Sequence, residues 1–188
     1  MFTGIIRGSR PVISIVDKPG LRRIVVDLGE PLGANVERGA SIAINGVCLT
    51  ATEMEAGKIA FDIIAETLNK TTLGGLSEGS MVHVERSAKF GDEVGGHVVS
   101  GHVTGMAEVT SVESPENNHV ITMRAPEEAI DFIFSKGFVA LDGASLTVVD
   151  VDREQRTFCV WLIPETLEIT TFGDRVAGDF INLEVDPQ

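Results

Sequence analysis

The sequence predicts an all-β fold made of two tandem, closed or nearly closed six-stranded barrels. Three observations lead to this prediction: an internal repeat, many short runs rich in β-branched residues, and turn residues between these runs. Gly, Asn, Asp and Pro recur about every 8–12 residues, a spacing typical of small barrels and sandwiches. The chain of 188 residues is long enough for two small domains of this kind.

The repeat consists of four blocks that occur in both halves in the same order. The paired blocks are 2–8 with 99–105, 44–50 with 141–147, 66–74 with 165–173, and 79–85 with 178–184. The offset is 97 residues for the first two pairs and 99 for the last two. A period this long indicates a duplicated domain, because solenoid repeats span roughly 20–50 residues. We therefore expect an N-terminal barrel at 1–88, a Gly-rich seam at 89–97 and a C-terminal barrel at 98–188.

The expected strands follow in order along each half. They are 24–28, 41–45, 47–52, 58–64 and 81–85 in the first half, and 120–125, 137–143, 145–151, 156–162 and 180–185 in the second. The clearest helical signal is PEEAIDFIFS at 126–135, which has Pro in the first turn, acidic residues behind it, and four apolar residues at helical spacing. We therefore expect one helix there.

Composition and charge exclude several classes of function. The net charge of -13 and the pI near 4.6 argue against a nucleic-acid binder, which needs a basic face. No apolar run approaches the roughly 18 residues of a membrane helix, and the N-terminus lacks the features of a secretory signal. The two cysteines, Cys48 and Cys159, do not match a metal or redox motif, so we expect free thiols in a cytoplasmic protein, with Cys159 in a barrel core.

The second pair of blocks, INGVCLT and LDGASLT, combines a turn signal with reactive side chains. Asn-Gly and Asp-Gly favour two-residue hairpin turns, because both central residues need a positive φ. In the strand that follows each turn, Cys48 and Thr50 point to one face, as do Ser145 and Thr147. These side chains either fill a barrel or line two related pockets for two similar ligands.

The third pair of blocks begins with Glu-Thr-Leu in both halves. A strand edge before this motif can offer backbone N–H and C=O groups to a planar heterocycle, and Asp62 can hold the hydroxyls of a polyol. The alternative is that Glu66-Thr67 and Glu165-Thr166 cap short helical turns.

Several longer motifs resemble one known family. They are MFTGI at the start, NGVCLT, SAKFGDEVGGHVVSGHV, KGFVALDGASLTV, LIPETLEITT and LEVDPQ at the end. Over its whole length the chain resembles the riboflavin synthase family of the alpha type. The resemblance implies two six-stranded Greek-key barrels and a C-terminal helix that assembles a homotrimer. The chain ends at Gln188, before the position of that helix, so the trimer is expected from the resemblance alone.

The resemblance also implies a reaction. Two molecules of 6,7-dimethyl-8-ribityllumazine dismutate by transfer of a four-carbon unit, giving riboflavin and 5-amino-6-ribitylaminouracil without a cofactor or metal. The active site of the family forms between the N-terminal barrel of one subunit and the C-terminal barrel of its neighbour. Some members associate with lumazine synthase. Two copies of one substrate require two related pockets, which gives the repeat a chemical meaning.

Candidate catalytic residues follow from this chemistry. One lumazine must lose a proton from its 7-methyl group, and because the ring delocalises the resulting negative charge, a general base of near-neutral pKa suffices. His102, which replaces Ile5 at the matching position, and His97 in the seam are the candidates, although a lone His is more often structural. Cys48 is expected to attack the acceptor carbon or activate water, and Ser145 to play a weaker polar role. By resemblance, the other members of the site are Lys136, Asp142, Asp186 and Phe2.

The remaining expected contacts are to the substrate. They are Gly4, Ile5, Ile6, Leu49, Thr50, Asp62, Ile64, Thr67, Gly101, Val103, Leu146, Thr147, Trp161, Ile163 and Thr166, together with Cys48, His102, Lys136 and Ser145. A non-catalytic lumazine- or flavin-binding protein of the same duplicated fold is the alternative. A flavin- or nicotinamide-dependent reductase is a third hypothesis, but the sequence lacks a phosphate-binding Gly motif before a helix.

Overall fold

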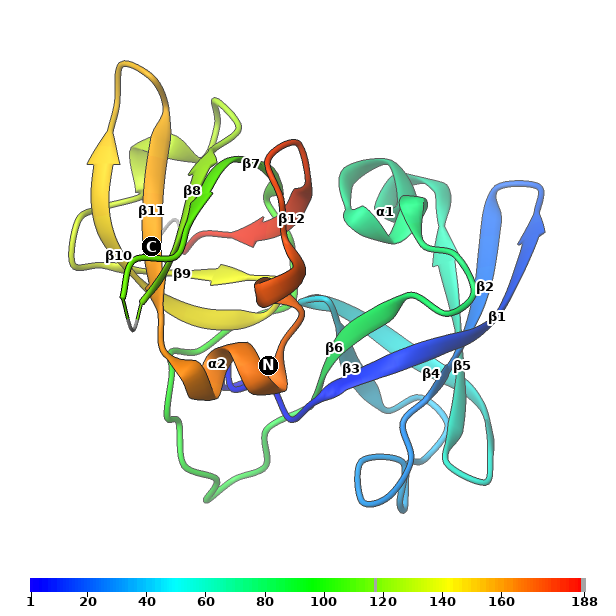
Figure 1. Cartoon of the computed structure of the whole chain (residues 1–188). Helices are drawn as coiled ribbons and strands as arrows, with labels where there is room; N and C mark the ends of the chain where they lie inside the picture. Colours follow the sequence, from blue (N-terminus) through cyan, green and yellow to red (C-terminus); the bar gives the residue numbers. More distant parts are fainter. Residues whose placement is uncertain (117, 187–188) are drawn as a thin grey trace.

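The computed structural model describes residues 1–116 and 118–186, which form two closed antiparallel barrels side by side (Figure 1). The N-terminal barrel contains β1 (Ser9–Lys18), β2 (Leu21–Asp27), β3 (Ser41–Ile44), β4 (Val47–Glu55), β5 (Lys58–Ile64) and β6 (Met81–Arg86). The C-terminal barrel contains β7 (Gly105–Glu113), β8 (His119–Arg124), β9 (Phe138–Leu141), β10 (Ala144–Asp152), β11 (Thr157–Leu162) and β12 (Phe180–Glu184). The predicted all-β fold of two six-stranded barrels is confirmed.

The two barrels have the same topology, as a duplication requires. The closed order is β1-β2-β5-β4-β3-β6 in the first barrel and β10-β11-β8-β7-β12-β9 in the second. Renumbering β7 to β12 as one to six makes the two cyclic orders identical. The non-consecutive neighbours β2–β5 and β3–β6, with their counterparts, are Greek-key connections.

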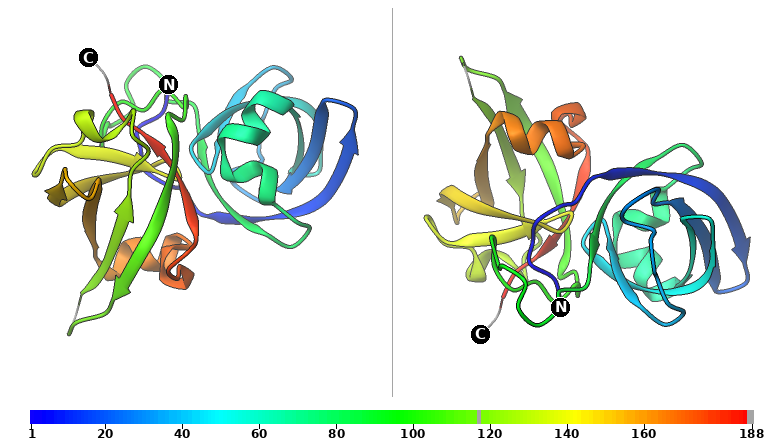
Figure 2. Two further views of the ribbon diagram at one scale, coloured as in Figure 1. Left: turned by 90° about the horizontal axis from the view of Figure 1, so that it is seen from above. Right: turned by 90° about the horizontal axis from the view of Figure 1, so that it is seen from below.

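Short helices join the strands at the barrel ends. They are α1 (Ala65–Lys70), η1 (Thr72–Gly75), η2 (Ile130–Phe132), α2 (Pro164–Ile169) and η3 (Phe172–Asp174). Figure 2 views the N-terminal barrel end-on, with α1 across its mouth. In the described part of the chain, no helix is long and apolar enough to cross a membrane.

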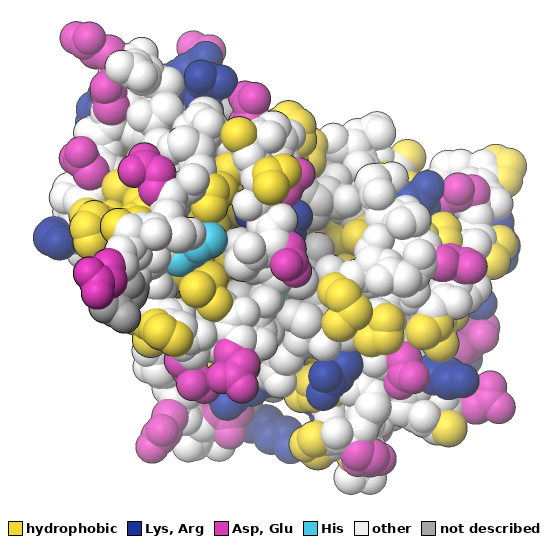
Figure 3. Space-filling view, in the orientation of Figure 1, with side chains coloured by type: hydrophobic (Ala, Val, Ile, Leu, Met, Phe, Trp, Pro, Cys, Tyr) yellow, Lys and Arg dark blue, Asp and Glu magenta, His cyan; other side chains and the backbone are white. Residues whose placement is uncertain are grey.

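Each barrel has its own apolar core, formed by inward side chains of alternating strand residues. Phe61, Ile24 and Ile59 are among the fully buried residues of the first core, and Phe158, Val160 and Leu183 lie in the second. The face in Figure 3 shows acidic side chains over both barrels with basic ones between them, in keeping with the net charge of -13.

The segments before β1 and β7 are exchanged between the barrels. Ile6 is buried in the core of the C-terminal barrel, and Val103 packs against the core of the N-terminal barrel. The two segments also pair with each other, because Phe2 N–H donates to the Val99 carbonyl at 2.7 Å and Val99 N–H donates to the Phe2 carbonyl at 3.0 Å. This exchange ties the two barrels into one unit.

Three local predictions were wrong or incomplete. The strands β1 and β7 were not among the expected segments. The helix predicted at 126–135 is only the three-residue η2. Its apolar residues Ala129, Ile130 and Ile133 instead plug the C-terminal barrel, and Arg153 donates to the Ile130 and Ile133 carbonyls at 3.0 and 3.2 Å. These contacts satisfy carbonyl groups that a helix would have bonded internally.

Candidate functional site

The two duplicated hairpin turns meet at the junction of the barrels. Asn45 and Gly46 have φ values of 45° and 77°, and Asp142 and Gly143 have 43° and 86°. Both central residues of each turn therefore have positive φ, as predicted for these dipeptides. A Cβ on Gly46 would lie 2.5 Å from the Gly143 nitrogen, so the two turns pack backbone against backbone with no room for a side chain at this position. A pseudo-twofold axis runs between them.

Cys48 and Ser145, which follow the two turns, each form a backbone hydrogen bond with the exchanged segment of the other repeat. Cys48 N–H donates to the Gly101 carbonyl at 2.9 Å, and Ser145 N–H donates to the Gly4 carbonyl at 2.8 Å. A Cβ on Gly101 would lie 2.5 Å from the Cys48 Cβ, and one on Gly4 would lie 2.6 Å from the Ser145 Cβ. Cys48 thus lies next to the segment 99–103 and Ser145 next to the segment 2–6 within one chain, a pairing that the sequence did not predict.

Two carboxylates that sequence reasoning missed hold these exchanged segments. Glu85 accepts hydrogen bonds from Thr3 N–H (2.6 Å), Thr3 Oγ1 (2.7 Å) and Gly4 N–H (3.1 Å). Glu184 accepts the matching bonds from Ser100 N–H (2.7 Å), Ser100 Oγ (2.8 Å) and Gly101 N–H (3.0 Å). We call these the Glu85 clamp and the Glu184 clamp. Their signal in the sequence was the aligned Glu at the end of the fourth pair of blocks.

The Glu85 clamp is the more buried of the two. Burial raises the pKa of the Glu85 carboxyl, while the hydrogen bonds from Thr3 and Gly4 act in the opposite direction. A carboxylate that accepts three hydrogen bonds holds its donors rigidly, because bonds to a charged acceptor are the stronger ones. The clamps therefore set the backbone positions of the glycines next to Ser145 and Cys48.

Six of the predicted substrate-binding residues line one small pocket of about 90 Å³ in the C-terminal half. They are Gly4, Ile5, Ile6, Ser145, Leu146 and Thr166. Strand β10, the exchanged segment and helix α2 bring them together, although they are far apart in sequence.

His97 lies beside this pocket and forms a hydrogen-bonded pair with Ser145. The His97 Nδ1 to Ser145 Oγ distance is 2.6 Å, and the imidazole stacks on Phe138 with ring centroids 4.2 Å apart. Burial lowers the pKa of His97, and the negative charge of Asp186 acts in the opposite direction. His97, His102 and Asp186 also line a second cavity of about 510 Å³, so three predicted catalytic residues surround one space.

Phe2 and Asp142 are buried away from these two cavities. Phe2 is 2% exposed and packs in a small cluster with Ala43, Val99 and Ala140, against which Cys48 also lies. Asp142 has 0% exposure. Their membership of the catalytic site stays a prediction.

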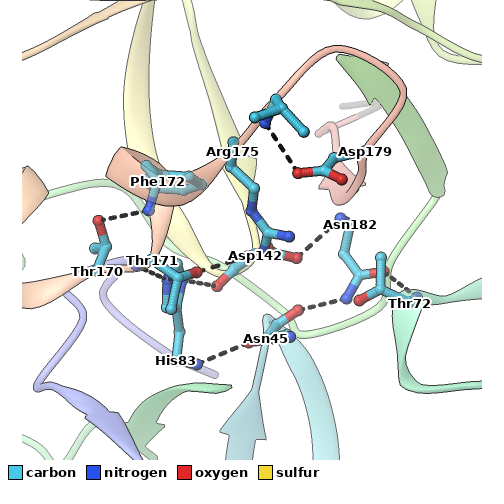
Figure 4. A network of polar contacts seen from close by, with 11 residues as sticks. Asn45, Thr72, His83, Asp142, Thr170, Thr171, Phe172, Arg175, Asp179 and Asn182 are labelled. Carbon is cyan, nitrogen blue, oxygen red and sulfur yellow. Dashed lines mark hydrogen bonds and ion pairs between the residues drawn. The ribbon is translucent and has the colours of Figure 1, made fainter. Parts of the chain in front are cut away.

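Asp142 belongs to a polar network at the junction. Its carboxylate accepts hydrogen bonds from Asn182 N–H and Arg175 Nη2, both at 2.9 Å (Figure 4). Burial raises its pKa to about 6, although Arg175 and the Asn182 amide act in the opposite direction. Asp142 is not among the described residues that line the two cavities at Ser145 and His97.

The other predicted residues lie mostly on the outer surface. Asp62 forms a two-point ion pair with Arg23 at 2.7 and 2.9 Å, and Arg23 lowers the pKa of its carboxyl. Leu49 is buried in the first core, and Val103 packs against that core. The exposed members are Thr50, Ile64, Lys136, Thr147, Trp161 and Ile163.

The Glu-Thr-Leu motifs are helical. Thr67 lies in α1 and Thr166 in α2, as the alternative interpretation predicted. The capping part of that interpretation was wrong, because the N-cap residues are Ile64 and Ile163. Cys159 was also misplaced: it lies half-buried on the outer face of β11, between the inward Phe158 and Val160.

Comparisons with known proteins agree with this architecture. The family described as lumazine binding domain matches residues 3–87 and 100–186. Riboflavin synthase of Escherichia coli (strain K12) is 47% identical over 189 residues, covering 100% of this chain and 88% of the relative. Riboflavin synthase of Mycobacterium bovis is 39% identical over 188 residues, covering 99% and 93%. The crystal structure of LumP complexed with 6,7-dimethyl-8-(1'-D-ribityl) lumazine has the same fold, with a TM-score of 0.89 at 22% identity over 99% of each chain. The chain therefore belongs to the riboflavin synthase family, and each of its halves is a lumazine binding domain.

Proposed function

We propose that this chain catalyses the dismutation of two 6,7-dimethyl-8-ribityllumazine molecules to riboflavin and 5-amino-6-ribitylaminouracil, without a cofactor or metal. The observation that carries the proposal is the pair of related but unequal sites in the two halves. One site presents Cys48 next to Gly101 and His102, and the other presents Ser145 next to Gly4 and Ile5. One compound that plays two different parts in a reaction needs this combination of likeness and difference.

The His97–Ser145 pair provides the proton-transfer chemistry of the proposal. Its lowered pKa keeps His97 neutral near pH 7, which is the form a general base requires. If Nδ1–H donates to Ser145 Oγ, then Nε2 is an acceptor that can take a proton from the 7-methyl group of a lumazine. Stacking on Phe138 holds the imidazole plane, which supports an orientation effect on the rate.

We further propose that a second copy completes each active site, within a homotrimer. The predicted contacts Ile64, Trp161 and Ile163 are 56%, 51% and 63% exposed, although they are large apolar side chains. A neighbouring subunit that covers them together with a bound lumazine would remove this apolar surface from water. The division into barrels at 1–88 and 98–188, a cytoplasmic location and association with lumazine synthase are parts of the same proposal.

Incubation of the purified protein with 6,7-dimethyl-8-ribityllumazine tests the proposal, with riboflavin fluorescence as the readout. We expect turnover, and we expect Cys48→Ala to reduce it far more than the matched control Cys159→Ala. Equal losses in the two variants would contradict the role of Cys48. Binding of lumazine without turnover would favour a non-catalytic lumazine- or flavin-binding protein, and no binding would exclude both functions.

A further inference from the structure

Ser100 and Glu184 connect strand β12 to His102 through a short chain of hydrogen bonds. The Ser100 hydroxyl donates to Glu184 Oε1 at 2.8 Å, and the same hydroxyl oxygen accepts from His102 N–H at 3.1 Å. Ser100 is therefore donor and acceptor at once, and hydrogen bonds joined in this way strengthen one another. We call this arrangement the Ser100 relay.

The barrel fixes the first member of the Ser100 relay. Glu184 is the last residue of β12, and it pairs with Ala140 of β9. Its carboxylate also accepts from Ser100 N–H at 2.7 Å and from Gly101 N–H at 3.0 Å. A side chain on a paired strand is a firmer support than one on a loop. The relay thus ties the loop 100–102 to the sheet of the C-terminal barrel.

The backbone N–H groups of residues 99–102 are all hydrogen-bonded as a result. The first donates to the Phe2 carbonyl, the next two donate to Glu184, and the last donates to the Ser100 hydroxyl. The side chain of His102, by contrast, is exposed, and its imidazole makes no hydrogen bond or ion pair with any described residue. The position of the His102 backbone therefore decides which space the imidazole can reach.

The N-terminal half repeats the first bonds of the relay but not the last one. Thr3 Oγ1 donates to Glu85 at 2.7 Å, as the matching serine does in the other half. The residue that matches His102 is Ile5, and among the described residues its N–H makes no hydrogen bond with Thr3. An interaction that the fold alone required would be expected in both halves. The bond that completes the relay occurs only in the half that has a histidine.

The cavity of about 510 Å³ brings this histidine next to other members of the predicted site. Ser100 and His102 line it, and so do His97 and Asp186. The two imidazoles are held in different ways, because His97 is bonded through its ring, by Ser145 Oγ at 2.6 Å. His102 is held only through its backbone, so the relay takes the place of a partner for the ring.

We propose that Ser100 is a positioning residue for His102 in the dismutation, acting through the His102 N–H. The inference rests on the proposed function. The Ser100 hydroxyl fixes the backbone from which the imidazole enters the cavity of about 510 Å³. Orientation effects depend on displacements of about 1 Å, so loosening this backbone lowers the rate of turnover more than it weakens substrate binding.

Steady-state kinetics of Ser100→Ala with 6,7-dimethyl-8-ribityllumazine test the inference. We expect kcat to fall about 10-fold, the effect of one hydrogen bond, with KM changed less than about 2-fold. Ser100→Thr keeps the hydroxyl, as Thr3 does in the other half, and should restore kcat to within about 2-fold. The matched control is Ser114→Ala, because its hydroxyl pairs with His119 Nδ1 at 3.1 Å and neither residue lines the cavity. This control should turn over as the unmodified protein does.

A double-mutant cycle with His102→Ala separates positioning from a role in folding. If Ser100 acts through the imidazole, Ser100→Ala should reduce the residual turnover of His102→Ala by less than about 2-fold. Hydrogen exchange of the His102 amide, followed by NMR, gives a readout that needs no turnover. This exchange should be at least about 10-fold faster in Ser100→Ala than in Ser114→Ala, because only the first variant removes the acceptor.

The opposite results overturn the inference. A loss of turnover in Ser100→Ala that persists in full in the His102→Ala background, or that Ser100→Thr does not restore, would show that Ser100 acts on another group or on the fold. Unchanged kcat or unchanged exchange at His102 would show that the relay does not hold this backbone. Absence of turnover in the unmodified protein would overturn the proposed function and this inference together, whereas turnover combined with any of the results above contradicts the inference alone.

Discussion

Replacing Arg175 with Leu tests whether Arg175 is present in the C-terminal half to neutralise the buried carboxylate of Asp142, since the matching residues of the N-terminal half are Leu76 and Asn45. The variant has the leucine found at the matching position of the N-terminal half, Leu76, but its Asp142 carboxylate stays buried with the Asn182 N–H as a hydrogen-bond donor. Removing one partner of a buried ion pair costs about 3–5 kcal/mol. The Arg175 side chain is 21% exposed, and water therefore screens part of the charge. We expect the free energy of unfolding to fall by about 3 kcal/mol, at the lower end of that range.

The double variant Asp142→Asn, Arg175→Leu installs the Asn45 and Leu76 combination of the other half. Its amide oxygen can still accept from Asn182 N–H, and no charge remains buried. We expect it to recover to within about 1 kcal/mol of the unmodified protein, which makes the coupling energy between the two sites about 2–3 kcal/mol. Urea unfolding followed by circular dichroism measures all three variants of this cycle, which are Arg175→Leu, Asp142→Asn and the double variant.

The matched control is Arg124→Leu, because Arg124 pairs with Glu108 at the same distance of 2.9 Å on the exposed surface. Exposed pairs contribute about 0–1 kcal/mol, so this variant should unfold nearly as the unmodified protein does. A cost of Arg175→Leu no larger than that of Arg124→Leu would refute the reasoning. So would a double variant less stable than the single one.

The same variant has a pH dependence with a definite sign. Burial raises the pKa of Asp142 to about 6 with Arg175 present, and removing that cation raises it further. The penalty of Arg175→Leu comes from the ionised carboxylate, so protonation relieves it. We expect the penalty to shrink as the pH falls from about 8 to about 5. A penalty that stays constant over this interval would show that packing loss, and not buried charge, causes it.

Three further predictions concern the junction and the clamps. Burial lowers the pKa of His83 to about 4 from an ordinary value of 6.5, so the unfolded state binds a proton at a higher pH than the folded state does. The free energy of unfolding should therefore decline by about 3 kcal/mol as the pH falls from 6.5 to 4. His83→Asn should flatten this part of the profile when the urea midpoint is measured against pH. Replacing Glu184 with Gln removes the negative charge of the Glu184 clamp. We expect steady-state kinetics to show a fall in turnover of about 10-fold with a smaller change in lumazine binding. Unchanged turnover would contradict a positioning role for Glu184. Gly4→Ala should lower the free energy of unfolding in urea by about 3 kcal/mol or more, because its Cβ would lie 2.6 Å from Ser145 Cβ at a φ of +74°. The control Gly79→Ala has a φ of +88° in open space and should lower it by about 1–2 kcal/mol. Equal losses in the two variants would show that steric contact with Ser145 does not contribute.

The sequence allowed good predictions wherever local chemistry decides the conformation. Asn45-Gly46 and Asp142-Gly143 are turns because few other residues adopt positive φ at two successive positions. The duplication of whole blocks also predicted two equal barrels. The helix prediction at 126–135 was wrong because the apolar spacing of this segment suits a helix and also suits a loop that packs into the end of a barrel. In the structure Arg153 donates hydrogen bonds to two backbone carbonyls of this loop.

The contacts between the two repeats could not be predicted from the sequence. The segments 2–6 and 99–103 look alike, and nothing in their residues says that each packs on the opposite barrel. Consequently the clamps of Glu85 and Glu184 were missed, since each holds a segment about 80 residues away. Phe2 was placed in the site for its aromatic ring, yet the exchange buries that ring beneath Gly101 and Cys48.

The differences between the two halves fall into two groups that have different physical meanings. At the junction, Asp142 occurs with Arg175 and Asn45 occurs with Leu76, so one substitution compensates the charge of the other. Such pairs preserve the fold and require no ligand. The change from Cys48 to Ser145 belongs to the other group: Ser145 Oγ lies 2.6 Å from His97 Nδ1, whereas Cys48 packs against the apolar cluster around Phe2. The proposed function assigns this second kind of difference to the two unlike roles of the substrate molecules. Asp142 takes part in the first kind of difference through its ion pair with Arg175, and its catalytic role stays a prediction.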